Sequence, residues 1–277
     1  MAGKKKDTSL LHHLIGSRSL VWNLAKNDIK KKFAGSYFGV VWAFVQPVIT
    51  VLLYWFVFEK GLNSKATDLR TGIEIPFVLC LTAGLVPWFY FQEALNGGTG
   101  VLVEYSYLVK KVVFQIDMLP VVKMISALFT HLFFVAFTIV LFICMGYMPD
   151  WYALQVVYYS FCMILFATGL VYATSAVTVF FRDMKEVVGI LLQIGMWVTP
   201  IMWNFETMVQ IPGWAITVLK LNPMYYIVSG YRNALINHIG FWEDMGLTVY
   251  FWVVTAVILF LGTTVFKRLR PHFADVL

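Results

Sequence analysis

Residues 10–58 decide the fold: LLHHLIGSRSLVWNLAKNDIKKKFAGSYFGVVWAFVQPVITVLLYWFVF. The first part, 10–33, is rich in lysine and gathers its apolar residues on one side of a helical wheel, which is typical of a helix lying on a membrane surface. A short Ala34-Gly35-Ser36 joint leads into an apolar run, 38–58, which is long enough to cross a bilayer. The stretch therefore predicts an amphipathic interface helix within residues 1–37 that feeds directly into a membrane span.

The composition predicts an integral membrane protein. The chain has 277 residues, of which 60% are hydrophobic and 13% are charged, whereas a soluble domain is about 45–50% apolar and about 25% charged. Its polar stretches are too short to bury a core of their own. We expect an all-α fold with one transmembrane domain, 38–277. Cys80, Cys144 and Cys162 lie in apolar runs without metal-ligand spacing, so we expect no metal site.

Six segments are candidate membrane spans, because a spanning helix needs about 20 mostly apolar residues. The fifth is the shortest and runs to Pro200. The candidates are 38–58, 75–95, 120–146, 154–181, 187–204 and 246–266.

The positive charges predict the orientation. Placing the N-terminus in the cytoplasm puts most of the 21 lysine and arginine residues inside, as expected for cytoplasmic loops. Lys60, Lys65, Arg70, Lys220 and Arg232 remain outside. We therefore expect both termini in the cytoplasm. The formal net charge of +6 indicates contact with anionic lipid, not with nucleic acid.

Between the last two spans, residues 205–245 are too apolar for an ordinary external loop. Pro212-Gly213 and Asn222-Pro223 divide them into pieces too short to cross. Such pieces are tolerated at membrane depth where protein or a cavity covers them. We therefore expect re-entrant gate helices, at about 205–236, at the outer mouth of a pathway.

The segment at about 96–118 contains several glycines, but no Gly-Lys-Ser/Thr follows them, so a phosphate-binding loop is rejected. If ATP drives this protein, another polypeptide binds it. The segment is amphipathic enough for a short helix below the membrane, and a plain connecting loop is the alternative. The second inner turn, 181–186, is either a solvated turn or an element that transmits motion.

The predicted spans contain few charges. Lys123 is explained by snorkelling to the interface, and His131 is more simply a core residue than a proton relay. The scarcity of charge in mid-membrane argues against a proton-coupled carrier.

Aromatic residues make up 17% of the chain. Many suit the membrane interfaces, whereas others could line a pathway and stack on sugar rings. The candidate lining residues are Trp42, Phe44, Tyr54, Trp55, Trp197, Trp203, Trp214, Tyr225 and Tyr226.

Several motifs, distributed over most of the chain, resemble the permease subunits of ABC exporters for O-antigen, capsular polysaccharide and wall teichoic acid, in the type-2 ABC transporter family. Phe38 departs from the leucine usual before Gly39. The matching motifs are 23–30, 32–39 with Trp42 and Pro47, 54–58, 83–89, Phe181-Arg182-Asp183, Thr199-Pro200-Ile201 and 221–226.

The resemblance implies a homodimer of this chain with two copies of a cytoplasmic ABC ATPase, which would bind ATP and magnesium, so the chain itself needs no cofactor and has no catalytic residue. It implies that 96–118 is a coupling helix, and that the hairpin is an external gate. The expected ATPase-coupling residues are Glu104, Tyr105, Tyr107, Lys110, Lys111, Arg182 and Asp183.

The cargo implied is a polymer on an undecaprenyl-pyrophosphate or similar lipid, exported across a bacterial inner membrane. We expect Lys30, Lys31 and Lys32, beside the first span, to attract the anionic head group. An exporter of the same fold for a drug or a lipid is the alternative. A lipid-linked transferase and a passive channel are further rivals, although the chain lacks the clustered acids or histidines that a transferase needs.

Overall fold

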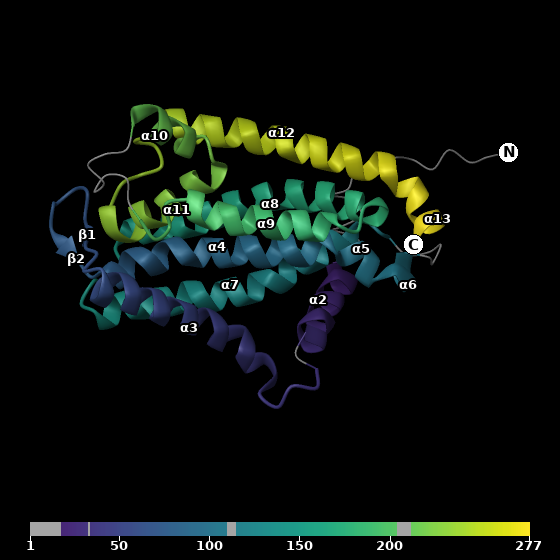
Figure 1. The fold of residues 1–277 in the computed structure, drawn as a ribbon, viewed down its shortest axis with the longest axis horizontal. Helices are drawn as coiled ribbons and strands as arrows, with labels where there is room; N and C mark the ends of the chain where they lie inside the picture. The colour runs from purple at the N-terminus through teal and green to yellow at the C-terminus, as the bar shows by residue number, and fades with distance from the viewer. Residues whose placement is uncertain (1–17, 33, 110–114, 204–211) are drawn as a thin grey trace.

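The computed structural model describes residues 18–32, 34–109, 115–203 and 212–277 as a bundle of long helices that run side by side (Figure 1). The long helices are α3 (Trp42–Trp55), α4 (Phe77–Thr99), α7 (Met118–Cys144), α8 (Gln155–Phe180), α9 (Met184–Val198) and α12 (Met245–Leu269).

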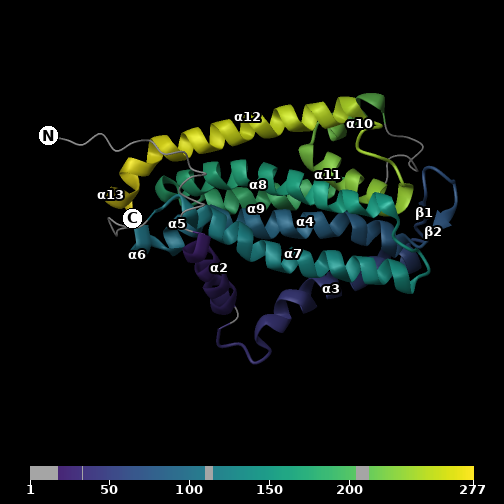
Figure 2. The ribbon, with the colours of Figure 1, turned by 180° about the vertical axis from the view of Figure 1, so that it is seen from behind.

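Shorter elements cover the two ends of the bundle, which Figure 2 shows from behind. At one end, here called the basic end, lie α2 (Arg18–Lys32), α5 (Val101–Glu104), α6 (Ser106–Val109) and α13 (Phe273–Val276). At the opposite end lie β1 (Ala66–Thr67), β2 (Glu74–Ile75), α10 (Gly213–Lys220) and α11 (Pro223–Arg232). Short 3₁₀ segments are Gly39–Val41, Trp151–Leu154 and Arg270–His272, and π-helical turns are Phe56–Gly61 and Asn233–Asn237.

Within the described ranges, five helical segments are long and apolar enough to cross a membrane. They are Trp42–Gly61, Phe77–Thr99, Met118–Cys144, Trp151–Phe180 and Met245–Val276. The fold is therefore that of an all-α, multi-pass membrane protein.

The predicted fifth span, 187–204, corresponds to α9, which is shorter than expected. With 15 residues it is roughly 22 Å long, less than the bilayer core of about 30 Å. The helix ends because Thr199 is extended, with φ −74° and ψ 127°, the backbone that a following proline favours. Residues 204–211, where the hairpin was expected to begin, lie outside the described residues.

Helix α4 is the centre of the bundle, and it packs against α3, α7, α8, α9 and α11. Most of its spanning window is buried. It also continues to Thr99, past the predicted boundary at residue 95. At Gly98, near the end of α4, an added Cβ would overlap Val171 of α8. The glycines of this segment thus allow close helix packing, as small residues do in membrane bundles.

Helix α3 leans away from the bundle near its start (Figures 1 and 2), and Val51 is its buried residue. The connection from α2 turns at Gly35, whose φ of 82° lies in the left-handed region that glycine adopts without strain. The Ala34-Gly35-Ser36 joint therefore directs α3 away from α2. The candidate site is a cleft lined by side chains of α3 together with those of α2, α4 and α7.

Candidate functional site

A cleft of about 830 Å³ opens between α2, α3, α4 and α7 at the basic end, and it is called the basic-end cleft below. A cleft of this size is in the range of ligand sites. Its lining combines aromatic, uncharged polar and charged side chains. The residues that define it are Asp28, Lys31, Lys32, Trp42, Gln46, Thr50, Tyr54, Phe89, Gln92, Glu93, Asn96, Glu104, Lys123, Ser126, Thr130 and Met196, with smaller residues between them.

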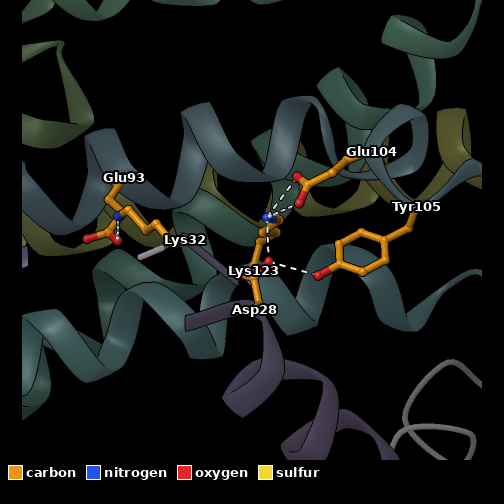
Figure 3. Close-up of polar contacts among 6 residues, drawn as sticks. All are labelled: Asp28, Lys32, Glu93, Glu104, Tyr105 and Lys123. Atoms are coloured by element: carbon orange, nitrogen blue, oxygen red, sulfur yellow. Dashed lines mark hydrogen bonds and ion pairs between the residues drawn. The ribbon is translucent and has the colours of Figure 1, made fainter. Parts of the chain in front are cut away.

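Asp28, Glu104 and Lys123, which line this cleft, form a charged network with Tyr105 (Figure 3). Lys123 Nζ on α7 lies 2.6 Å from Asp28 Oδ1 on α2 and 2.8 Å from Glu104 Oε2 on α5. Tyr105 donates its hydroxyl to the same Asp28 oxygen at 2.9 Å. One lysine therefore joins three elements that are far apart in the sequence.

The sequence explains why Asp28 faces inward. It follows Val21 and Ala25 on the buried side of α2, and residues at such spacings share one face of a helix. Asp28 breaks the apolar pattern of that face because Lys123 needs an anion there. The snorkelling explanation of Lys123 is thus wrong, since its ammonium is held inside by two carboxylates.

Tyr105 connects this network to the short helices α5 and α6. It is 2% exposed, and burial together with the nearby Asp28 carboxylate raises the pKa of its phenol. The hydroxyl therefore remains protonated and able to donate. The Lys31 ammonium lies 5.3 Å from the Tyr105 ring centre and 5.9 Å from that of Tyr107, a cation–π geometry.

The residues expected to couple to an ATPase divide into two groups. Glu104 and Tyr105 belong to the charged network with Lys123 and Asp28, although the Glu104 side chain is also 49% exposed. Tyr107, Arg182 and Asp183 are exposed and outside this network. Lys185, in the first turn of α9, lies close to Gly100 between α4 and α5, where an added Cβ would overlap it. Lys110 and Lys111 lie outside the described residues.

The three lysines expected to attract a lipid head group have different surroundings. Lys31 and Lys32 line the basic-end cleft. Lys30 is exposed and does not line it. Lys32 Nζ lies 2.6 Å from Glu93 Oε1 on α4 (Figure 3), so a carboxylate already partners one of them.

Of the aromatic residues expected to line a path, Trp42 and Tyr54 meet in the cleft. Phe44, on the same helix, instead packs on Phe133 of α7, with ring centres 4.0 Å apart. Trp55, near the end of α3, lies outside the cleft lining.

The remaining aromatic candidates lie apart from the cleft. Trp203 donates its indole N–H to the carbonyl oxygen of Trp197 at 3.0 Å. Trp214 is exposed on α10, and Tyr225 and Tyr226 are buried on α11. The Tyr226 hydroxyl lies 3.1 Å from a threonine hydroxyl of α12. Within one chain these aromatic residues therefore do not line a single cavity.

Sequence reasoning missed the uncharged polar wall of the cleft, although a signal for it exists. Gln46 and Thr50 on α3, Gln92 and Asn96 on α4, and Ser126 and Thr130 on α7 all line the cleft. Each pair has a spacing of four residues within an apolar helix, and such pairs lie on one helix face. Polar pairs at this spacing in three spans predict a shared polar surface.

Arg232, one of the cations expected on the outer side, lies on α11 at the end of the bundle opposite the basic end, and it is buried there. It is 8% exposed, and its guanidinium donates to the carbonyl oxygens of Pro200 at 2.6 Å and Cys80 at 3.3 Å, and also to that of Ile201. Carbonyls at the break after α9 have no helical partners, and a guanidinium has enough donors to serve several of them. Gly84 leaves room for it on α4.

These features define a class of protein: a multi-pass helical membrane transporter domain with a polar cleft at its basic end. The family model described as "ABC-2 type transporter" matches residues 19–236. This chain belongs to that family and is a transporter permease by class.

Two relatives extend the similarity over more than nine-tenths of the chain. The O-antigen export system permease protein RfbA of Myxococcus xanthus is 25% identical over 266 residues, which are 96% of this chain and 98% of the relative. The protein of the same name from Klebsiella pneumoniae is 21% identical over 258 residues, which are 92% and 93% of the two chains.

Proposed function

We propose that this chain is the transmembrane permease subunit of an ATP-driven exporter that moves a lipid-linked cell-surface polysaccharide or teichoic acid outward across a bacterial inner membrane. Two copies form the path, and two copies of a separate ABC ATPase bind and hydrolyse MgATP. The observation that carries this proposal is the basic-end cleft, found in a chain similar along its length to O-antigen permeases.

The lining of the cleft suits both the pyrophosphate and the sugar portion of such a cargo. Lys31 and Lys32 give it cations for a pyrophosphate, which lysine binds as a point charge. Gln46, Gln92 and Asn96 supply amides for sugar hydroxyls. Trp42 and Tyr54 provide aromatic faces for the apolar side of a sugar ring.

The ATPase docks at the basic end, on the cytoplasmic side. It contacts the exposed Tyr107, Arg182 and Asp183, and motion of α5 passes through Tyr105 and Asp28 to α2. Helix α9 provides the helical part of a sixth span, and α10 and α11 form the re-entrant outer gate. Both termini are then cytoplasmic. Support comes from the clustering of α2, α5, α6 and α13 at one end of the bundle.

Depleting this chain from its native cell tests the proposal. We expect surface polysaccharide or teichoic acid to fall and its lipid-linked form to accumulate inside, with recovery on re-expression. Normal surface polymer combined with greater sensitivity to small amphiphiles would instead support a drug or lipid exporter.

The head-group role of the lysines has a separate test. Changing Lys30, Lys31 and Lys32 together to glutamine should reduce polymer export and the ATPase activity stimulated by lipid-linked substrate. If both stay at the wild-type level while the protein is present in normal amount, the head group binds elsewhere.

A further inference from the structure

The ion pair between Lys32 and Glu93 spans the basic-end cleft. Lys32 is the last residue of α2 and Glu93 lies 61 positions later on α4, with Nζ and Oε1 2.6 Å apart. Both residues line the cleft. Their side chains remain 49% and 27% exposed, so a ligand in the cleft can reach both partners.

The charges around the cleft are balanced in this structure. Lys31, Lys32 and Lys123 line it together with three carboxylates. Lys123 is held by Asp28 and Glu104, and Lys31 lies over tyrosine rings. The Lys32 ammonium points to the cleft, and the Glu93 carboxylate neutralises it there. A strongly anionic ligand therefore competes with Glu93 for Lys32.

We propose that Glu93 is a resident counter-ion of Lys32, and that the phosphate or pyrophosphate of a lipid-linked substrate displaces it on binding. This inference rests on the proposed function, from which it takes the ligand class. A pyrophosphate carries more negative charge than a carboxylate, so it attracts the ammonium more strongly. The released Glu93 is partly exposed and regains water as its partner.

Such a counter-ion gives selectivity. A weakly charged head group gains little binding energy by replacing the Glu93 carboxylate, whereas a pyrophosphate gains more. Competition from Glu93 therefore disfavours weakly charged ligands. The exchange also changes what holds the end of α2. Lys31, the neighbouring residue, contacts the rings of Tyr105 and Tyr107. Ligand binding in the cleft therefore alters the position of the expected coupling segment.

The experiment measures binding of farnesyl diphosphate to the full chain in nanodiscs of phosphatidylcholine, which carry no anionic lipid. Farnesol and inorganic pyrophosphate are the comparison ligands. We expect farnesyl diphosphate to bind more tightly than either. Equal affinity for inorganic pyrophosphate would overturn the lipid-linked assignment.

The decisive variant is Glu93→Gln, which removes the carboxylate that pairs with Lys32. We expect the affinity for farnesyl diphosphate to increase about fivefold, the size expected for a partly exposed ion pair. The matched control is Glu74→Gln at the opposite end, which removes the same charge from an exposed pair with Lys65, and it should leave the affinity unchanged. A merely structural role for Glu93 would lower the affinity.

Two further variants separate the counter-ion from the site itself. Lys32→Gln should weaken binding, and adding Glu93→Gln to it should recover only the part of the affinity that is lost to repulsion by the unpaired carboxylate. The double variant Lys32→Glu with Glu93→Lys exchanges the two charges and keeps both an ion pair and a lysine in the cleft. It should bind farnesyl diphosphate with nearly the affinity of the wild type.

The possible failures are distinguishable. If Lys32→Gln weakens binding but Glu93→Gln does not tighten it, the counter-ion role is overturned and the phosphate site of the proposed function stands. If neither variant changes binding, the phosphate site is overturned as well.

Discussion

The ammonium of Lys123 on α7 lies 2.6 Å from the carboxylate of Asp28 on α2, and their side chains are 12% and 7% exposed. This pair attaches the surface helix to the bundle. It also brings Asp28 to the hydroxyl of Tyr105, so the attachment of α2 and the position of α5 depend on the same carboxylate.

Asp28→Asn should lower stability, because it leaves a mostly buried ammonium with Glu104 as its remaining carboxylate in the network. Breaking a buried pair costs about 3–5 kcal/mol, and the remaining partner reduces this to roughly 2 kcal/mol. Thermal unfolding in detergent measures it. The control is Glu74→Gln, which breaks an exposed pair and should cost less than about 1 kcal/mol. Equal midpoints for the two variants would show that the Asp28 pair contributes no special stability.

Gly98→Ala should destabilise the bundle, because the new methyl group would overlap Val171. Overpacking of this kind costs about 1–3 kcal/mol. Gly189→Ala is the matched control, since it is also helical and its Cβ would meet nothing within 4 Å. That change should be neutral or stabilising by up to about 1 kcal/mol. A Gly98→Ala protein as stable as the wild type would contradict the close packing of α4 on α8.

Arg232→Met should loosen the opposite end of the bundle, because Pro200 and Ile201 lose their donor. Leaving buried carbonyls without a partner costs about 1–3 kcal/mol. Lys65→Met removes an exposed cation and serves as the control. Hydrogen exchange of α11 should accelerate in Arg232→Met alone. Unchanged exchange would mean that the guanidinium does not secure α11 to the break after α9.

Tyr107→Ala should weaken assembly with the ATPase while leaving the stability of this chain nearly unchanged, because the ring is 51% exposed at the basic end. Co-purification of the two subunits measures it. Trp151→Ala, an exposed aromatic residue in the connection between α7 and α8, should leave the yield of complex unchanged. Normal recovery of the ATPase with Tyr107→Ala would exclude this surface from the contact.

The spans were predictable from the sequence because an apolar run long enough to cross a bilayer is a local property. The partners of Asp28 and Arg232 were not, since one sequence does not state which helix faces which. Asp28 and its partner Lys123 are 95 positions apart. The sequence indicated only an outer cation at Arg232, because its acceptors are backbone carbonyls, which carry no sequence signal.

The aromatic prediction shows a second limit. Trp42 and Tyr54 meet in the cleft, whereas Tyr226 is buried in the core of one chain. Amino-acid type suggested sugar contact for all of them, but aromatic residues serve packing as well as recognition. The polar pairs on α3, α4 and α7 are a better signal, because uncharged polar groups within a span need hydrogen-bonding partners.

The most direct test of the account is ATP-dependent uptake of a radiolabelled lipid-linked polysaccharide into inside-out vesicles that contain this chain and its ATPase. We predict that polymer becomes protected inside the vesicles when ATP is supplied, and that Lys32→Gln reduces this uptake. Uptake that is equal without ATP, or equal in vesicles that lack this chain, would contradict the claim that this protein is the membrane path of a polysaccharide exporter.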